Sequence, residues 1–371
     1  MKLTVQTKLL PTVEQAAALL RTLEAANAAA NAISTRAWSE RTFQQFSLHR
    51  LVYAAIRAET GLSAQMVVRL IGKVADAYKL DRARPRRFHR LGSIAYDERI
   101  LRWKDAAVSI WTVDGRQAIP FVCGDRQREL LASQQGERDL VYRDGAWYLF
   151  ATVEYTKPPE SEITGWVGVD LGIVNIAVTS DGAIHAGRQV TALRHRHRKL
   201  RQRLQKKGTK AATRLLKRRR VKEARFGTWV NHTISKRIVA DCEGTKRGIV
   251  LEDLKHIRSR VTARRSQRAT LHSWSFGQLQ SFLAYKATMR GVPIRFVDPR
   301  NTSRRCPSCG HTELGNRPNQ ATFLCKSCGL AGLADLIAAQ NLVALGRGSV
   351  NSPYAGECVE TQHASPESRL L

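Results

Sequence analysis

The sequence is short of acidic residues and contains no long apolar run. Its 371 residues include 31 Asp and Glu against 61 Lys and Arg, which gives a formal net charge of +30 at pH 7. A compact chain with this excess repels itself unless an anionic partner neutralises it. A nucleic acid is the expected partner, and an anionic membrane surface is the alternative. A membrane helix needs an apolar run of about 18 residues, which this sequence lacks, so no membrane span is expected.

The first residues, Met1 to Lys8, lack the apolar stretch of a secretory signal. The chain is therefore expected to stay in a reducing cytosol, where paired cysteines hold metal more often than they form disulfides. Cysteine is scarce, with seven residues in all. Three of them, Cys123, Cys242 and Cys358, are isolated, and the other four form two close pairs.

The length suggests two or three domains at about 150 residues each. Residues 2–8 alternate like a strand, and helical patterns follow up to about residue 37 and near 46–58 and 62–80. From about 92 to 157 the pattern is that of strands, with hairpin turns at Asp114-Gly115 and Asp144-Gly145. We expect a small β-barrel here. If the first strand pairs back into it, the helical bundle is an insertion.

The second half alternates strands and helices. A strand, a turn and a second strand begin at Trp166, basic helices span 189–242, and a strand starts at Arg247. A helix near 275–290, a strand from Pro293, a cysteine-containing segment and a helix near 334–345 follow. This order, over residues 164 to 345, is what an RNase H-like α/β fold requires. Past Gly346 the chain contains Ser, Pro and Gly and is expected to be disordered.

Three acidic residues are placed as a metal-dependent nuclease requires. Asp170 lies in an apolar strand, Glu252 ends a second apolar strand, and Asp335 opens an amphipathic helix. A buried carboxylate is costly without a partner. Two divalent ions about 3.5–4 Å apart can activate water and stabilise the leaving oxygen of a phosphodiester. Carboxylate oxygens suit Mg2+ or Mn2+, so the three acids are predicted to bind two such ions and to be catalytic.

Each acid also has a simpler interpretation. Asp170 could cap the turn at Gly172, and Glu252 could form a salt bridge to the basic helices. Asp335 could be an ordinary helix N-cap. It is the joint arrangement of the three acids, rather than any one of them, that favours a catalytic role.

The close cysteine pairs have the spacing of a zinc site. Cys306 and Cys309 are separated by two residues, as are Cys325 and Cys328, and a Gly follows the second Cys of each pair. Such a Gly permits the left-handed turn of a zinc knuckle. A redox dithiol is the alternative, but one pair would suffice for it. Four thiolates fill all tetrahedral positions, so the predicted Zn2+ is structural.

Positive charge is concentrated in the predicted helices of the second half. Residues 188–222 contain no acidic residue, so a phosphate-binding track is favoured over a merely solvated face. A second basic stretch runs from Lys255 to Arg268, and Trp274 and Phe276 beyond it are expected to pack rather than to stack on bases. The residues predicted to contact nucleic acid are Arg194, Arg198, Arg201, Lys206, Lys207, Arg218, Arg219 and Arg220.

These motifs resemble those of the TnpB/OrfB proteins of bacterial insertion sequences, which are related to the type V CRISPR effector nucleases. The resemblance is carried by Gly168-Val-Asp-Leu-Gly, by Val250-Leu-Glu-Asp-Leu, and by the segment from Thr302 through the four cysteines to Ala334-Asp-Leu. It covers most of the chain. The sequence departs from the usual pattern at Ala334, where a basic residue is common, and at Ile337, where Asn is common.

The resemblance implies a domain plan. Residues 1–10 and 86–158 correspond to a wedge β-barrel, and residues 11–85 to a helical recognition lobe. Residues 163–300 correspond to a RuvC (RNase H-like) core with its basic helices, 301–332 to a zinc ribbon, and 333–346 to the last RuvC segment. A tail of residues 347–371 remains. Asp170, Glu252 and Asp335 correspond to the RuvC triad.

The resemblance also implies a function. Such proteins are RNA-guided nucleases whose guide comes from the transposon end, and they read a short motif beside a double-stranded DNA target. A bacterial, nucleoid-associated protein that is a monomer or dimer is expected. Two alternatives remain: a non-cleaving RNA-guided regulator, and an accessory protein or strand transferase acting directly in transposition. No serine or tyrosine nucleophile motif supports the last.

Overall fold

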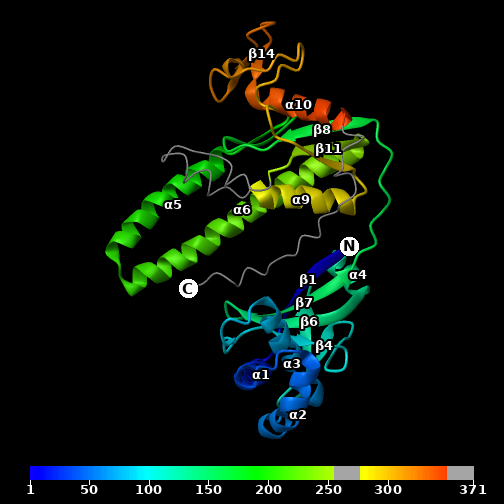
Figure 1. Cartoon of the computed structure of the whole chain (residues 1–371), viewed down its shortest axis with the longest axis vertical. Helices are drawn as coiled ribbons and strands as arrows, with labels where there is room; N and C mark the ends of the chain where they lie inside the picture. Colours follow the sequence, from blue (N-terminus) through cyan, green and yellow to red (C-terminus); the bar gives the residue numbers. More distant parts are fainter. Residues whose placement is uncertain (255–275, 349–371) are drawn as a thin grey trace. The chain divides into compact units, whose positions relative to one another are not determined.

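The computed structural model describes residues 1–254 and 276–348. The chain forms two compact units, Met1–Thr156 and Lys157–Leu371 (Figure 1). The second basic stretch, Trp274 and almost all of the tail expected to be disordered lie outside the described residues. Within the described residues, no helix is both long and apolar enough to cross a membrane.

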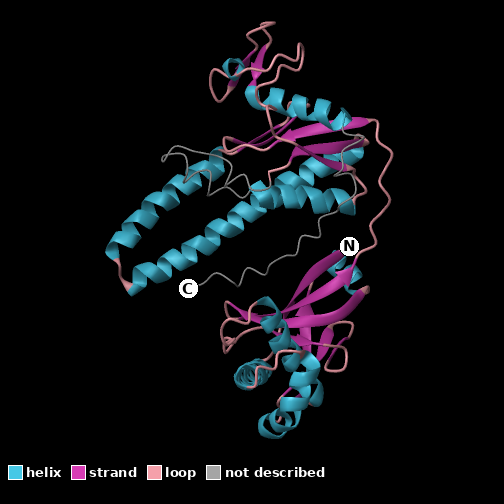
Figure 2. Ribbon diagram, in the orientation of Figure 1, coloured by secondary structure: helices cyan, strands magenta, loops and turns pink. Residues whose placement is uncertain are grey.

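The first unit is built on a seven-stranded antiparallel sheet (Figure 2). Its strand order is β2-β6-β7-β1-β5-β4-β3, with β1 at Lys2–Leu9, β2 at Ile94–Tyr96, β3 at Leu101–Trp103, β4 at Ala107–Thr112, β5 at Gly115–Val122, β6 at Gln134–Arg143 and β7 at Ala146–Glu154. The Trp103 indole on β3 donates a hydrogen bond to Gln134 of β6, and the Tyr96 hydroxyl on β2 donates to the Trp111 carbonyl of β4. These bonds join the two ends of the sheet, so it nearly closes into the expected barrel.

The first strand does pair back into this sheet. It runs antiparallel to both β7 and β5, from Lys2 opposite Glu154 to Leu9 opposite Phe121. The turns at Asp114-Gly115 and Asp144-Gly145 connect β4 to β5 and β6 to β7, as predicted. Both Asp144 (φ 53°) and Gly145 (φ 77°) have positive φ, the conformation that a tight two-residue hairpin turn requires.

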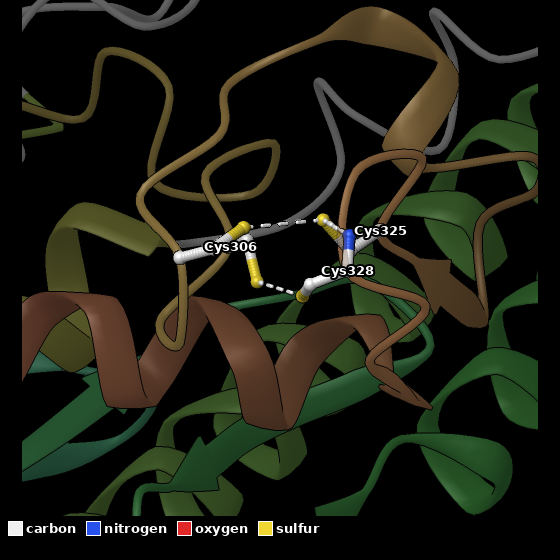
Figure 3. Close-up of side chains that lie close together, drawn as sticks. Cys306, Cys325 and Cys328 are labelled. Carbon is white, nitrogen blue, oxygen red and sulfur yellow. Dashed lines mark hydrogen bonds between the residues drawn. The ribbon is translucent and has the colours of Figure 1, made fainter.

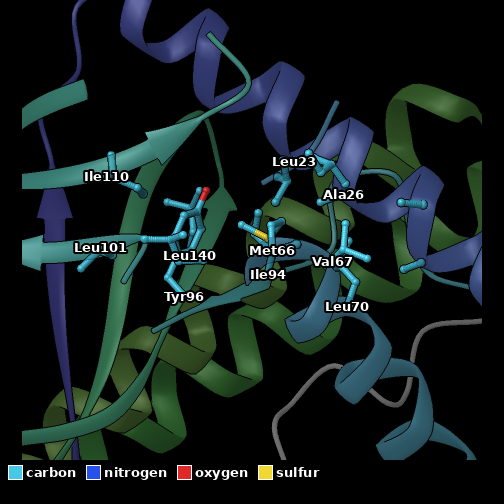
Figure 4. Packing of buried hydrophobic residues seen from close by; sticks show 14 of the residues in the cluster. Leu23, Ala26, Met66, Val67, Leu70, Ile94, Tyr96, Leu101, Ile110 and Leu140 are labelled. Carbon is cyan, nitrogen blue, oxygen red and sulfur yellow. The ribbon is translucent and has the colours of Figure 1, made fainter. Parts of the chain in front are cut away.

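Three helices lie between β1 and β2 in the chain and pack on the sheet. They are α1 (Val13–Ser39), α2 (Gln45–Thr60) and α3 (Ala64–Leu80). Their apolar stripes and the facing strands form a single buried core (Figure 4), which includes Leu23, Ala26, Met66, Val67, Leu70, Ile94, Tyr96, Leu101, Ile110 and Leu140. The helical bundle is therefore an insertion between two strands of one sheet.

One element of this unit was not predicted. Residues 92–157 were expected to contain only strands, but helix α4 spans Asp125–Leu131. None of its residues is buried, so it has no apolar stripe from which to predict it. It begins where the Gln127 side chain accepts a hydrogen bond from the Gly124 amide.

The second unit contains a mixed five-stranded sheet of order β10-β9-β8-β11-β12. Its strands are β8 (Gly165–Asp170), β9 (Asn175–Thr179), β10 (Ile184–Ala186), β11 (Arg247–Glu252) and β12 (Ile294–Val297). The first three form an antiparallel meander, whereas β11 is parallel to β8 and β12 is parallel to β11. The predicted succession of strand meander, helix, strand, helix, strand, helix is present.

Helices cover both faces of this sheet. Val167, Val169, Ile249 and Leu251 pack with residues of α6 (Lys210–Gly244) and α9 (Phe276–Met289) on one face. On the other, Val250 and Val297 pack against Leu342 of α10 (Ala334–Gly348). Phe276 is buried in the first of these cores, as expected. Helix α10 extends into residues 347–348, which were assigned to the tail.

Helix α10 lies unusually close to the central strand. A Cβ atom placed on Gly168 would lie 1.9 Å from the Ala339 carbonyl oxygen. Only a residue without a side chain allows this approach, so Gly168 fixes how closely α10, and hence Asp335, lies to β8.

Helices α5 (Arg188–Lys207) and α6 form a long hairpin that extends beyond the sheet (Figure 1). The turn contains Gly208 at φ 62°, and the Thr209 hydroxyl caps α6 by accepting a hydrogen bond from the Ala212 amide. On the described part of the hairpin before Asp241, Glu223 is the sole acidic residue. It contacts His197 at 3.2 Å and Arg201 at 3.0 Å, which ties α6 to α5.

Candidate active site and four-cysteine module

The side-chain alternation of two parallel strands places two acids on one face of the sheet. Val169 of β8 pairs with Leu251 of β11, so Asp170 and Glu252 follow at neighbouring strand ends. Because alternate residues of a strand point to opposite faces, these acids lie on the face of Gly168 and Val250, which α10 covers. The carboxyl ends of β8 and β11 therefore present both carboxylates toward α10.

The third acid comes from α10 itself. Asp335 is the second residue of this helix, so its charge lies in the first turn, where the helix dipole favours an anion. Its Oδ2 accepts a hydrogen bond from the Asn175 side chain of β9 at 2.9 Å. Asn175, 160 positions earlier in the sequence, thus holds Asp335 at the edge where β8 and β11 end.

The three carboxylates interact electrostatically. Burial, followed by the charges of Glu252 and Asp335, raises the pKa of Asp170 to about 8 from an ordinary value of 3.8. Burial also raises the pKa of Glu252, which the hydrogen bond from Thr302 partly offsets. A carboxyl group held near other carboxylates in a poorly solvated place resists ionisation until a cation neutralises it.

Two contacts from outside the sheet reach these acids. The Thr302 hydroxyl donates to Glu252 Oε1 at 2.5 Å. Arg317 Nη2 lies 3.3 Å from Asp335 Oδ1. Its positive charge partly offsets the rise in the pKa of Asp170 and in that of Glu252. Both residues belong to the segment between β12 and α10, so this segment contributes to the site.

Each simpler interpretation of an acid requires a particular contact. The Gly172 amide donates to the Ile176 carbonyl at 3.3 Å, so backbone closes the turn that Asp170 could have capped. Asp335 lies inside the helix rather than at its cap and accepts bonds from Asn175 and Arg317. Among the described residues, the Glu252 carboxylate accepts a hydrogen bond from Thr302, and the basic stretch that starts at Lys255 lies outside them. The three carboxylates are not packed as tightly as the four cysteines described below, and their shared catalytic role stays a prediction.

The four paired cysteines converge on one point (Figure 3). Their Sγ atoms all lie within 4.8 Å of one another. Among the described residues, no other group of three or more metal-ligating side chains packs this tightly. Cys306 and Cys328 Sγ are 3.6 Å apart, as are Cys309 and Cys325 Sγ. Tetrahedral zinc with Zn–S bonds of about 2.3 Å requires sulfur atoms roughly 3.8 Å apart. The cluster therefore fits a zinc site.

Both halves of this module fold alike. The Gly310 amide donates to the Cys306 carbonyl and the Gly329 amide to the Cys325 carbonyl, each at 3.0 Å, and φ is 76° at Gly310 and 75° at Gly329. These are the left-handed turns that the sequence predicted. The Cys328 amide also donates a hydrogen bond to Cys325 Sγ at 3.4 Å, which lowers the pKa of Cys325 and favours its thiolate. A stabilised thiolate is the form that binds metal.

Short elements attach the module to α10. Strands β13 (Thr322–Leu324) and β14 (Ala331–Leu333) form its hairpin, and the short 3-10 helix η1 (Leu314–Asn316) lies between the knuckles. Ile337 and Ala334 pack with Cys306, Cys325 and Phe323 in a small core. The two departures from the family pattern are thus apolar contacts between helix and module.

Seven of the eight basic residues predicted to bind nucleic acid are exposed on the α5–α6 hairpin. Arg194 is the exception: it is partly buried, and burial lowers its pKa. Arg201 is exposed but pairs with Glu223. The other six are Arg198, Lys206, Lys207, Arg218, Arg219 and Arg220.

Two parts of the chain match models of known families. Residues 150–256 match the OrfB_IS605 model, described as a probable transposase, and residues 276–342 match the Cas12f1-like TNB domain. The first segment contains Asp170 and Glu252, and the second contains all four cysteines and Asp335. The chain therefore carries a zinc-ribbon-like TNB domain beside an OrfB-type segment.

Curated relatives match parts of this chain. Over 125 residues, the chain is 39% identical to the CRISPR-associated endodeoxyribonuclease Cas12f1 of Sulfoacidibacillus thermotolerans, covering 33% of this chain and 28% of the relative. It is 34% identical over 125 residues to a TnpB-like protein of Methanocaldococcus jannaschii, covering 33% and 44%. InsQ of Escherichia coli K12, whose name describes a candidate RNA-guided DNA endonuclease, is 27% identical over 54% of each chain. The chain spans about a quarter to a half of these relatives' lengths.

Solved structures share the fold more completely. A Cas12f1 chain from a complex with single guide RNA and target DNA has a TM-score of 0.55 and 14% identity, covering 88% of this chain and 82% of its own. The mini-RNA-guided endonuclease Cas-phi3 has a TM-score of 0.59 and 11% identity, covering 93% and 92%. Over these segments the chain is thus similar to TnpB-like proteins and to the type V effector Cas12f1.

Proposed function

We propose that this protein is an RNA-guided, metal-dependent endonuclease that cleaves double-stranded DNA beside a short target-adjacent motif. The observation that carries the proposal is the environment of Asp170, whose pKa is raised to about 8 by burial and by the charges of Glu252 and Asp335. The names of the relatives, an endodeoxyribonuclease and a candidate RNA-guided DNA endonuclease, support it.

The donor set fits two divalent cations. The three carboxylates offer hard oxygen ligands of the kind that Mg2+ or Mn2+ prefers. Burial and the charges of the other two acids together raise the pKa of Asp170, and bound cations would relieve the repulsion between the carboxylates. When bound, such a pair of ions supplies an activated water and neutralises the charge on the leaving oxygen.

The chain's own groups have distinct parts in this arrangement. Asp170 and Glu252 present their carboxylates from rigid parallel strands, and Asp335 does so from the first turn of α10. Asn175 and Thr302 hold one oxygen each of Asp335 and Glu252. Arg317 lies 3.3 Å from Asp335 and adds positive charge close to where a scissile phosphate would bind. These groups form a RuvC-type, RNase H-like centre.

The cysteine module has a separate part. Four thiolates complete a tetrahedral shell and leave no position for water, so a Zn2+ bound there is structural rather than catalytic. We infer that it supports the segment from which Thr302 and Arg317 reach the carboxylates.

The α5–α6 hairpin provides a track for nucleic-acid backbone. Exposed arginines and lysines with one acidic residue among them neutralise phosphates without reading bases. Pairing between guide RNA and target strand then reads the sequence, while the protein reads only the short adjacent motif. This division suits a chain with a net charge of +30.

The domain plan follows from the same proposal. The nearly closed barrel of residues 1–10 and 86–158 serves as the wedge, and the helices within 11–85 serve as the recognition lobe. Residues 163–300 and 333–346 form the nuclease core around the zinc ribbon of residues 301–332.

The decisive experiment begins with the RNA that copurifies with the protein. Sequencing should reveal one discrete species, which is then used to program cleavage of a plasmid bearing the matching target beside a randomised flanking sequence. Mg2+-dependent double-strand cleavage is expected from the wild-type protein. Asp170→Ala should abolish cleavage while binding of RNA and DNA persists.

Other results would favour the other functions. Guide-dependent DNA binding by the wild-type protein without any nicking would indicate a regulator. DNA joining that survives RNase treatment would indicate a strand transferase. Cleavage by Asp170→Ala at the wild-type rate would exclude the proposed centre.

A further inference from the structure

Thr302 lies where three parts of the second unit meet. It follows β12, precedes Cys306 by four residues and is 3% exposed. Its hydroxyl donates to Glu252 Oε1 at 2.5 Å and lies 3.0 Å from the Pro299 carbonyl. The much shorter contact is the one to Glu252. A hydrogen bond to a charged acceptor is roughly twice as strong as a neutral one.

The backbone of the same residue is bound to α10. The buried Asn341 side chain donates to the Thr302 carbonyl and to the Arg305 carbonyl, each at 2.7 Å. Arg305 directly precedes the first zinc-ligating cysteine, and Asn341 lies six residues after Asp335 in one helix. The side-chain amide of Asn341 thus joins α10, which carries Asp335, to the residues just before the cysteine module.

We propose that Thr302 is a positioning residue through which the cysteine module sets the geometry of the carboxylate centre. Its hydroxyl fixes the Glu252 carboxylate by one oxygen and leaves Oε2 available for a cation. Asn341 of α10 binds the Thr302 carbonyl. The contact between Thr302 and Glu252 therefore keeps a fixed position relative to α10 and to Asp335. The inference rests on the metal site proposed above and adds a residue that the carboxylate pattern alone does not identify.

The physical consequence is preorganisation. Without the Thr302 hydroxyl, Glu252 regains rotamer freedom, and ordering it again opposes metal binding. Residues that orient metal ligands typically change metal affinity by about 10–100-fold when they are replaced. The folded structure should change little, because valine has nearly the same shape as threonine.

The test compares three variants by Mg2+ binding. Thr302→Val removes the hydroxyl, Thr302→Ser keeps it, and Thr312→Val is the matched control, because the exposed Thr312 hydroxyl bonds only the nearby Gly310 carbonyl among the described residues. Mg2+ affinity is measured without turnover, by isothermal titration and by the Mg2+-dependent rise in Tm. Zinc content and circular dichroism report on folding.

The expected result is a roughly 10–100-fold weaker Mg2+ affinity for Thr302→Val, with zinc content and fold retained. The half-saturating Mg2+ concentration for cleavage should shift in parallel. Thr302→Ser and Thr312→Val should stay within about threefold of the wild type. The serine rescue separates loss of the hydroxyl from general disturbance of the loop.

Unchanged Mg2+ affinity in a folded, zinc-loaded Thr302→Val protein would overturn the inference. Thr302→Ala is the second variant, and failure of both to fold while Thr302→Ser folds would overturn it too, by showing a folding role. Asp170→Asn tests the underlying site separately. If Mg2+ stabilises wild type and Asp170→Asn equally, the proposed metal site itself fails; if only Thr302→Val is unaffected, the positioning role alone fails.

Discussion

Asp170 and Glu252 occupy matching ends of two neighbouring parallel strands, one residue beyond the paired Val169 and Leu251. This relationship places two carboxyl groups on one face of the sheet, and the charge of Asp335 on α10 also acts on Asp170. The charge of Glu252 is, after burial, the strongest influence raising the pKa of Asp170.

The raised pKa of Asp170 predicts how stability depends on pH without divalent ions. The folded chain holds this proton up to about pH 8, whereas the unfolded chain releases it near 3.8. Between these values the folded state binds more protons, so this group makes the free energy of unfolding fall as pH rises. The decline should end above about pH 8.

Asp170→Asn isolates this contribution. The amide cannot ionise, so at pH 8 the variant should be more stable than the wild type in Mg2+-free buffer, by on the order of 1–3 kcal/mol. Thermal melts at pH 5 and pH 8, with zinc retained, measure it. Mg2+ should raise the Tm of the wild type at pH 8 and leave that of the variant unchanged. A wild-type advantage at pH 8 without Mg2+ would contradict the assignment.

Removal of zinc should disturb the carboxylate centre as well as the cysteine module. Cys306→Ser or Cys325→Ser breaks the tetrahedral set, and structural zinc sites contribute folding free energy directly. We expect about one zinc ion per chain in the wild type and much less in these variants, together with weaker Mg2+ binding.

Cys123→Ser is the control for this prediction. Cys123 belongs to the first unit, outside the module, so zinc content and Mg2+ affinity should match the wild type. Colorimetric zinc release and calorimetric Mg2+ titration make the comparison. Full Mg2+ affinity in a zinc-free Cys306→Ser protein would show that the centre assembles independently of the module.

Gly168→Ala should force α10 away from β8. The new Cβ would lie 1.9 Å from the Ala339 carbonyl oxygen, a backbone atom that cannot move without the helix. Overpacking of this kind costs about 3 kcal/mol or more, and displacement of Asp335 should reduce cleavage strongly. Chemical unfolding and cleavage rates test both effects.

Gly165→Ala on the same strand is the matched control. Its Cβ would lie 4.0 Å from the Arg247 side chain, an ordinary contact. Stability and cleavage should stay near wild-type values. Equal losses in both variants would trace the effect to the flexibility of the strand rather than to the distance between helix and strand.

Replacement of Arg218, Arg219 and Arg220 by Gln should weaken RNA binding most at low salt. Removing one arginine–phosphate interaction reduces the slope of log affinity against log salt by about 0.7–0.9, so removing three predicts a change of about 2–3. Arg290→Gln is the control, because this arginine is already paired with Glu243. Filter binding across a salt series distinguishes them, and equal slopes would remove the hairpin from the interface.

The sequence predicted those features that depend on local pattern. Strand alternation, helical stripes and Asp-Gly turns identify most elements, and the cysteine spacing identifies the module, because each signal lies within a few residues. The three acids were found because a charge inside an apolar strand or at a helix start is unusual in its immediate surroundings.

The supporting residues could not be found in this way. Thr302, Asn175, Arg317 and Asn341 are single polar residues whose partners are 18 to 160 positions away. Nothing in their neighbourhood shows that they will be buried against a carboxylate or a backbone carbonyl. Only the sheet register and the approach of α10 bring them into contact.

The position of α10 also affects the order of events during synthesis. The strands that carry Asp170 and Glu252 emerge from the ribosome well before residue 335, and until then Val250 and Val297 have no helix covering them. A nascent chain stalled before α10 thus has two of three acids and an uncovered apolar row. Under the proposed function such a chain cannot cut DNA, and the nuclease becomes active only once the helix beyond the cysteines has been made.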